Sequence, residues 1–199
     1  MHFRIPIVLA FFVALAAAGC AAPFSVHQLA PREAQLALTG NVLTTGELSD
    51  FTKIVLRKHD LLSSFEHDPD TALATLRTAT IANPRAEDEL FALAELSYLH
   101  AENTATLHSQ QAHYLAAALY GYALLFPGPD IEPLESIDPR ARIAADIYNR
   151  ALAEAFETKN RADVELAAGI YPLPFGQIEV AFDATSLDFG VGRFTDFMR

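Results

Sequence analysis

The chain has 199 residues, 51% of them hydrophobic and 20% charged, with one cysteine and no tryptophan. This composition is typical of a globular protein, and the length suffices for one domain with a hydrophobic core and no internal disulfide. The net charge of −11 argues against nucleic-acid binding and against electrostatic docking on anionic lipid, because both depend on Lys and Arg.

The first twenty residues have the three-part form of a secretory signal. Arg4 supplies a positive amino-terminal region, and residues 5–18 form an uncharged, strongly apolar stretch. Small residues then lead into Gly19 and Cys20. We therefore predict a signal peptide over residues 1–19.

The tetrapeptide Ala17-Ala18-Gly19-Cys20 resembles the bacterial lipobox, in which small residues precede a cysteine that receives lipid. The resemblance implies that Cys20 is the lipidated first residue of the mature protein. Ala21, rather than Asp, follows it, which implies a place in the cell envelope at the outer membrane. Two alternatives stay open: ordinary cleavage nearby, giving a soluble secreted protein, and an uncleaved membrane anchor.

Beyond the leader, hydrophobic residues recur at helical spacing through most of the chain. Three helix starts carry a capping residue: Ser49, and the pairs Asp68-Pro69 and Asp138-Pro139, with proline at the first helical position. The predicted helices cover residues 31–38, 49–65, 68–83, 86–102, 109–126 and 138–156. We predict a mainly α fold, an irregular helical bundle or array of about six helices.

The helical periodicity also predicts core side chains and loops. In the second and third helices, the residues expected to face the core are Phe51, Ile54, Val55, Leu62, Phe65, Leu73, Leu76 and Ile81. Residues 44–46 and the proline-rich residues 127–133 are predicted to be loops.

The end of the chain changes character, because apolar and polar residues alternate from Gln177 to Phe182. This alternation predicts a strand, and residues 187–189 predict a second short strand. Two strands are marginally stable alone, so helices or another chain must cover them. The predicted division is a signal peptide (1–19), a lipidated amino terminus and linker (20–48), a helical domain (49–168) and a short β segment (169–199).

The sequence contains no catalytic motif: G-x-S-x-G, H-E-x-x-H, the Walker glycine loop and the dinucleotide fingerprint are all absent. His100, His108 and His113, with Glu95 and Glu102 nearby, invite a metal interpretation. Their spacings do not place two ligands one turn apart on a helix face. We therefore expect solvated histidines, and predict no catalytic residue, metal or cofactor.

Other polar groups have structural interpretations. Glu87, Asp88 and Glu89 begin a predicted helix, where negative charge complements the helix dipole. Core packing is expected, rather than a groove for an apolar ligand, for the tyrosines at positions 98, 114, 120, 122 and 148.

The mature chain contains, in order, the blocks LTTGELSDFTKIVLRKHDLLSSF, FALAELSYLHAE, HYLAAALYGYALLFP, DPRARIAADIYNRALAEAF and LPFGQIEVAFD. Their order and spacing resemble the amino-terminal region of bacterial lipoprotein-type α/β hydrolases. The resemblance implies a helical segment that precedes a serine esterase or lipase domain. The catalytic residues of that domain would lie beyond Arg199, so none is carried over. Residues 86–126 also resemble a tetratricopeptide-type helical hairpin, without a repeat at a 34-residue period.

These observations predict an envelope lipoprotein whose helical domain is a non-catalytic scaffold or binds a protein partner. Its other partner is the membrane, through the lipid on Cys20. The alternative is the amino-terminal part of an α/β hydrolase whose catalytic domain is missing or separately encoded. A small molecule bound among the tyrosines is a third possibility.

Overall fold

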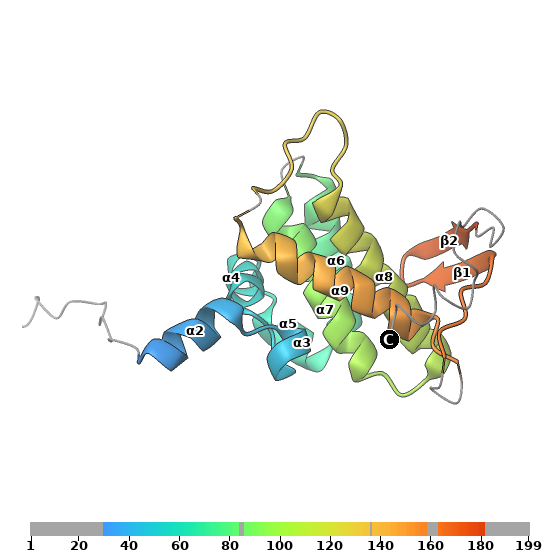
Figure 1. Ribbon diagram of the computed structural model, residues 1–199, viewed down its shortest axis with the longest axis horizontal. Helices are drawn as coiled ribbons and strands as arrows, with labels where there is room; N and C mark the ends of the chain where they lie inside the picture. The colour runs from blue at the N-terminus through green and yellow to red at the C-terminus, as the bar shows by residue number, and fades with distance from the viewer. Residues whose placement is uncertain (1–29, 84–85, 136, 159–162, 182–199) are drawn as a thin grey trace, which may run out of the picture. The chain divides into compact units, whose positions relative to one another are not determined.

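Eight helices and one β hairpin make up the part of the chain that the computed structural model describes, residues 30–83, 86–135, 137–158 and 163–181 (Figure 1). The helices are α2 (Pro31–Thr39), α3 (Val42–Thr45), α4 (Asp50–Lys58), α5 (Leu62–His67), α6 (Pro69–Ile81), α7 (Glu87–Glu102), α8 (Leu107–Leu125) and α9 (Pro139–Ala155). The strands are β1 (Gly169–Leu173) and β2 (Gly176–Val180). The predicted mainly α fold with a short hairpin near its end is confirmed.

The capping residues begin their helices as predicted. The side chain of Ser49 accepts a hydrogen bond from the Thr52 N–H, and Asp68 and Asp138 cap α6 and α9 in the same way. Pro69 and Pro139 occupy the first turns of α6 and α9, where a missing N–H costs nothing.

Helix α7 is the centre of the fold and contacts α3, α4, α6, α8 and α9. Its apolar residues are distributed around the whole helix, which suits a helix buried on every side. Phe91, Leu93 and Leu96 are each at most 1% exposed. Burying each of these side chains contributes roughly 1.5–3 kcal/mol.

Helices α8 and α9 approach each other closely at Gly121. A Cβ atom at this position would lie 3.3 Å from the carbonyl oxygen of Ala144 and 3.4 Å from the Cβ of Tyr148. The absent side chain therefore sets the distance between the two helices.

The segment before α6 differs from the prediction in two ways. Residues 42–45, half of them predicted as loop, form α3, because the Asn41 side chain caps it and Gly46 ends it in the left-handed region (φ 73°). The helix predicted over residues 49–65 breaks into α4 and α5 at Asp60, which has a positive φ of 56°.

Three of the predicted core residues, Ile54, Leu62 and Ile81, are exposed, so these predictions are wrong. Ile54 is 60% exposed and Ile81 is 69% exposed, whereas Val55, Leu73 and Leu76 are buried as expected. Leu62 is 37% exposed, and it follows the break at Asp60, where the predicted helix ends.

The hairpin packs on α8 through its turn and inner face. Leu173 is buried, the Phe175 ring lies 5.6 Å from the Tyr120 ring, and the Tyr171 ring lies 5.3 Å from the Phe156 ring. Strand β2 confirms much of the strand predicted over residues 177–182, but β1 was not predicted.

Several predictions lie outside the described residues: the leader, Cys20 and the strand at 187–189. In the described part, every helix is too short or too polar to cross a membrane.

Candidate functional site

Three side chains from three helices meet at one point: Asp70 in the first turn of α6, His100 in the last turn of α7, and His113 in α8. We call them the histidine cluster. The Nε2 atom of His100 lies 3.2 Å from Oδ1 of Asp70, and the Nε2 atom of His113 lies 3.4 Å from the same oxygen. The two imidazole rings meet edge to face, with centroids 4.3 Å apart.

The helices fix this geometry through neighbouring apolar contacts. Asp70 stands one turn before the buried Leu73, which packs α6 into the core. His113 stands one turn before the buried Ala116 and Ala117, in the part of α8 that contacts α7. The cluster therefore lies where α6 meets the α7–α8 hairpin.

His113 is the deeply buried member, with its side chain 5% exposed. Burial, together with the neighbouring His100, lowers the pKa of His113 to about 4 although Asp70 opposes the shift. Its Nδ1 atom has no hydrogen-bond partner among the described residues. The expectation that these histidines are solvated is therefore wrong for His113, while His108 is exposed.

A cavity of about 140 Å³ lies beside His113, between α6, α7, α8 and the hairpin turn. Its lining combines apolar residues with the side chains of Ser97, Arg77 and Tyr120. The guanidinium group of Arg77 lies 4.4 Å from the centre of the Phe175 ring and closes one side.

Ser97 and His113 line this cavity together, yet they do not form a nucleophile and base. A serine–histidine relay requires the hydroxyl to bond the imidazole nitrogen that faces away from the carboxylate. In His113 that nitrogen is Nδ1, which is unbonded within the described part of the chain. The cluster offers two imidazole nitrogens and a carboxylate rather than a nucleophile.

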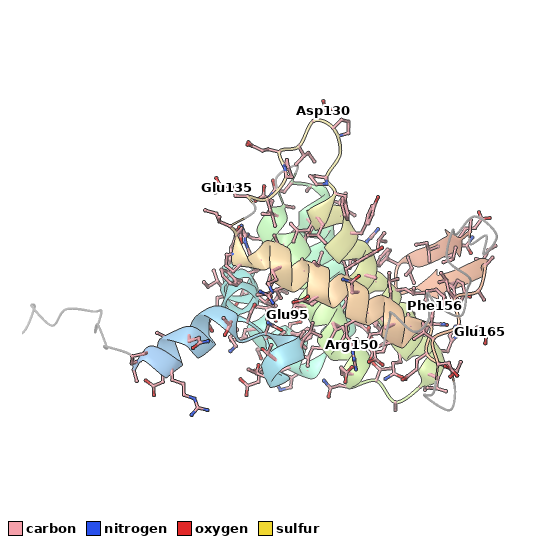
Figure 2. All side chains as sticks on the ribbon, viewed as in Figure 1. Glu95, Asp130, Glu135, Arg150, Phe156 and Glu165 are labelled. Carbon is pink, nitrogen blue, oxygen red and sulfur yellow. The ribbon has the colours of Figure 1, made fainter. Side chains whose placement is uncertain are left out.

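Glu95, one of the acids considered beside the histidines, has a different role. It is fully buried on α7, among the helices (Figure 2). Its Oε1 accepts hydrogen bonds from the backbone N–H groups of Val42 and Ser49, both at 3.0 Å, and its Oε2 accepts one from the Ser49 hydroxyl at 2.7 Å. These hydrogen bonds hold the residues before α4 against α7. The packed helical domain therefore begins before Ser49, the first residue of the predicted helical domain.

The acids at the start of α7 also have specific partners. Glu89 is buried and accepts hydrogen bonds from Lys58 at 2.7 Å and His59 at 3.1 Å. Arg140 at the start of α9 bonds Asp88 and its own cap Asp138. Charge complementarity to the helix dipole is therefore one part of their role, and fixing α4 and α9 against α7 is the other.

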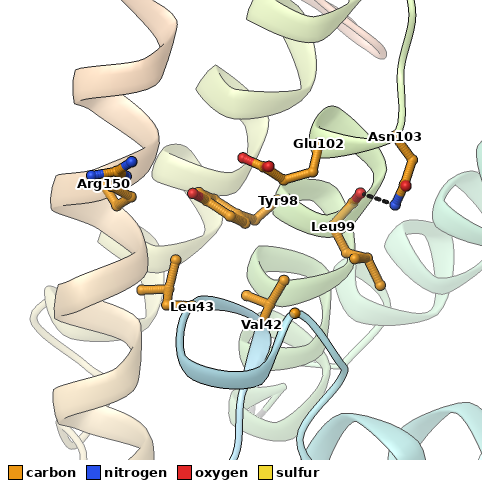
Figure 3. A pocket seen from close by; sticks show the side chains of 8 residues that line it. Val42, Leu43, Tyr98, Leu99, Glu102, Asn103 and Arg150 are labelled. Atoms are coloured by element: carbon orange, nitrogen blue, oxygen red, sulfur yellow. Dashed lines mark hydrogen bonds between the residues drawn. The ribbon is translucent and has the colours of Figure 1, made fainter.

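A larger, open cavity of about 690 Å³ lies between α3, α7 and α9. In Figure 3 the Tyr98 side chain on α7 points toward Arg150 on α9. Burial raises the pKa of the Tyr98 hydroxyl to about 12. Arg150 also bonds Glu154 at 2.7 Å, and Glu102 accepts a hydrogen bond from Tyr114 at 2.5 Å. These polar groups satisfy one another rather than converge on a ligand.

The tyrosines do not share one groove. Tyr98, Tyr114 and Tyr120 are buried, and each lines a different cavity. Tyr122 is 49% exposed and stacks near Phe126 and Tyr148. Core packing is thus confirmed for the three buried tyrosines and wrong for Tyr122.

The hairpin presents a second candidate site, the outer edge of β2. The register pairs Leu173 with Gly176 across a two-residue turn and Pro172 with Gln177. In an antiparallel pair of strands, residue pairs that exchange backbone hydrogen bonds alternate with pairs whose N–H and C=O groups point away from the partner strand. Pro172 has no N–H to donate, so Pro172 and Gln177 form a pair of the second kind. The backbone N–H groups of Gln177 and Glu179 therefore point away from β1.

Comparisons with protein-family models, with curated proteins and with solved structures found no match. The described residues define an α-helical domain that carries a β hairpin and a histidine cluster at the junction of three helices.

Proposed function

We propose that this chain is a lipid-anchored protein of the bacterial cell envelope, and that its helical domain is a non-catalytic scaffold that binds a protein partner through the open edge of β2. The observation that carries this proposal is a two-stranded sheet packed on α8, with one edge that no other strand of the described residues covers. The leader and Cys20 support the envelope location.

The two edges of the sheet differ. Strand β1 carries Pro172 on its outer side, and proline on an edge strand discourages further pairing. Strand β2 has Gln177 and Glu179 at the corresponding positions, both exposed, and no third strand pairs with it within the described residues. An extended partner segment can add to such an edge by main-chain hydrogen bonds.

The sheet is also anchored well enough to serve as a docking platform. Leu173 is buried, and Phe175 lies between Tyr120 and Arg77. A partner strand that adds to β2 would extend the sheet without disturbing these contacts, because they involve the turn and the face rather than the edge.

A second candidate for the partner is a serine α/β hydrolase domain, which is missing from this chain or separately encoded. The hairpin turn and β2 lie within the block from Leu173 to Asp183, one of those that carry the resemblance. In this case the helical domain is the accessory part of an esterase or lipase. The purified chain is expected to hydrolyse no ester in either case.

The test removes one outward N–H group from β2. Glu179→Pro deletes the donor, and the matched control Glu179→Ala removes the same carboxylate but keeps the N–H. Each form is purified from detergent-solubilised membranes of the source bacterium, and bound proteins are quantified by mass spectrometry. We expect one partner to be recovered with the parent and with Glu179→Ala, and at least about tenfold less with Glu179→Pro.

Equal recovery with both variants would contradict docking at this edge, and recovery of nothing above background would contradict partner binding. A fall in the melting temperature of Glu179→Pro relative to Glu179→Ala would mean either that the chain itself already pairs this edge or that the proline ring, which fixes φ at about −65°, strains β2. Sequencing the gene downstream of Arg199 distinguishes the second candidate from the first. The hydrolase candidate requires either a G-x-S-x-G coding stretch there or a hydrolase as the recovered partner.

A further inference from the structure

The histidine cluster has the composition of a metal site. Two imidazole nitrogens and one carboxylate oxygen form a donor set that suits zinc and its neighbours in the first transition series. We propose that Asp70, His100 and His113 bind a divalent transition-metal ion of the zinc class through one carboxylate oxygen and the two Nε2 atoms.

The separations between the donor atoms fit a tetrahedral ion. Zinc lies about 2.0–2.2 Å from nitrogen and oxygen ligands, which places neighbouring ligands of a tetrahedron roughly 3.3 Å apart. The two distances from Asp70 Oδ1 to the Nε2 atoms are 3.2 Å and 3.4 Å. All three donor atoms lie within 4.8 Å of one another, so a small side-chain rotation closes the third separation.

The apparent alternative is that both histidines donate an Nε2–H to the same oxygen of Asp70. The Asp70 side chain is 70% exposed, and ion pairs with exposed partners contribute little to stability. His113, in contrast, is buried with Nδ1 unbonded among the described residues, which is costly for a polar ring. An ion would replace the two protons directed at Asp70 Oδ1 and bind the same three donor atoms, whereas Nδ1 of His113 is unbonded among the described residues in either case.

The burial of the three ligands also fits an ion with one exchangeable position. His113 is buried, His100 is half-buried and Asp70 reaches solvent, so water can complete the coordination on the Asp70 side. Three protein ligands with an open fourth position are typical of zinc sites that retain a water. The bound ion would join the start of α6 to the α7–α8 hairpin.

The test measures metal binding by the full chain, purified in detergent without a histidine tag and stripped with a chelator. Zinc is titrated in competition with a chromophoric chelator, and cobalt(II) is titrated separately, because its visible absorption reports four-coordinate geometry. We expect one tight site per chain, with tetrahedral cobalt bands and a higher melting temperature in the presence of zinc.

The variants His100→Ala, Asp70→Asn and His113→Gln remove one ligand each, and His108→Ala removes an exposed histidine of α8 as the matched control. Loss of an outer-shell partner lowers metal affinity roughly 10–100-fold, so loss of a ligand should lower it by roughly 100-fold or more. His108→Ala should bind as the parent does. Circular dichroism identifies any variant that fails to fold, and His100→Ala, at a helix end, then carries the comparison.

Equal zinc affinity in His100→Ala and His108→Ala would overturn the proposal. Cobalt bands that persist in Asp70→Asn and His100→Ala together would overturn it as well, because the ion would then lie elsewhere. Partner recovery by the Glu179 variants does not depend on these residues, so the two proposals fail independently.

Discussion

Two buried glutamates on α7 show how single side chains fix the surrounding helices. Glu95 accepts three hydrogen bonds from Val42 and Ser49, and Glu89 accepts hydrogen bonds from Lys58 and His59. A buried polar group costs free energy unless its partners are in place. Each glutamate therefore stabilises the fold only while its particular neighbours are held near α7.

Glu89 is expected to make the stability of the fold depend on pH. Burial raises the pKa of Glu89, but the hydrogen bonds from Lys58 and His59 outweigh this effect and hold it below its ordinary value of 4.5. A carboxyl group whose pKa is lowered by folding stabilises the native state above that ordinary value, and this stabilisation is lost as the pH falls through the folded-state pKa. We expect Glu89→Gln to lower the free energy of unfolding by roughly 1 kcal/mol at pH 7.

Denaturant unfolding of the parent and Glu89→Gln at several pH values tests this. The difference between them should shrink as the pH falls below about 4.5. Glu47→Gln, which changes an exposed acid, is the control and should match the parent throughout. A difference for Glu89→Gln that stays constant down to pH 3 would mean that packing, rather than ionisation, causes it.

At the scale of helices and strands, local signals predicted where elements begin better than which way they face. Ser49, Asp68 and Asp138 cap their helices as expected, because capping depends on residues three or fewer positions away. Ile54 and Ile81 fit the helical periodicity but remain exposed. Periodicity identifies an apolar face but not how far a neighbouring helix extends to cover it.

Strand β1 was missed for a related reason. Its sequence, Gly-Ile-Tyr-Pro-Leu, contains glycine and proline, which are poor strand formers. Pro172 is tolerated because it lies on the outer side of an edge strand. Pairing with β2 and packing on α8, rather than local preference, make this segment a strand.

The packing of α8 against α9 gives a prediction at this scale. A side chain at Gly121 would press on the Ala144 carbonyl group and on Tyr148, both on α9. Gly121→Leu should lower the free energy of unfolding by roughly 1–3 kcal/mol or more, because overpacking forces the helices apart. Gly128→Leu is the control, since a Cβ there meets nothing within 4 Å, and should change stability by less than about 0.5 kcal/mol.

Chemical denaturation of the two leucine variants measures both effects. If Gly121→Leu were as stable as Gly128→Leu, the close approach of α8 and α9 at this point would be wrong.

At the scale of the whole molecule, the candidate sites depend on contacts that no local pattern contains. Asp70 and His100 are 30 residues apart, and Glu95 lies 46 residues from Ser49. The metal interpretation considered from sequence required two ligands on one helix, whereas the histidine cluster takes one from each of three helices. Only the fold brings them together, so the histidines could be identified but their third partner could not.

The proposed envelope location depends on a single residue, Cys20, which lies outside the described part of the chain. Cys20 is the only cysteine in the chain, so neither a disulfide within it nor a catalytic thiol competes with lipidation. If Cys20 carries lipid, Cys20→Ser should abolish labelling by alkyne palmitate, while Ala21→Ser, which keeps the cysteine, should label as the parent does.

Stable anchoring needs more than one acyl chain, and lipoprotein processing supplies several. The parent should therefore fractionate with membranes. Labelling of Cys20→Ser equal to that of the parent would contradict lipidation, and an unlabelled parent in the soluble fraction would indicate ordinary cleavage of the leader instead.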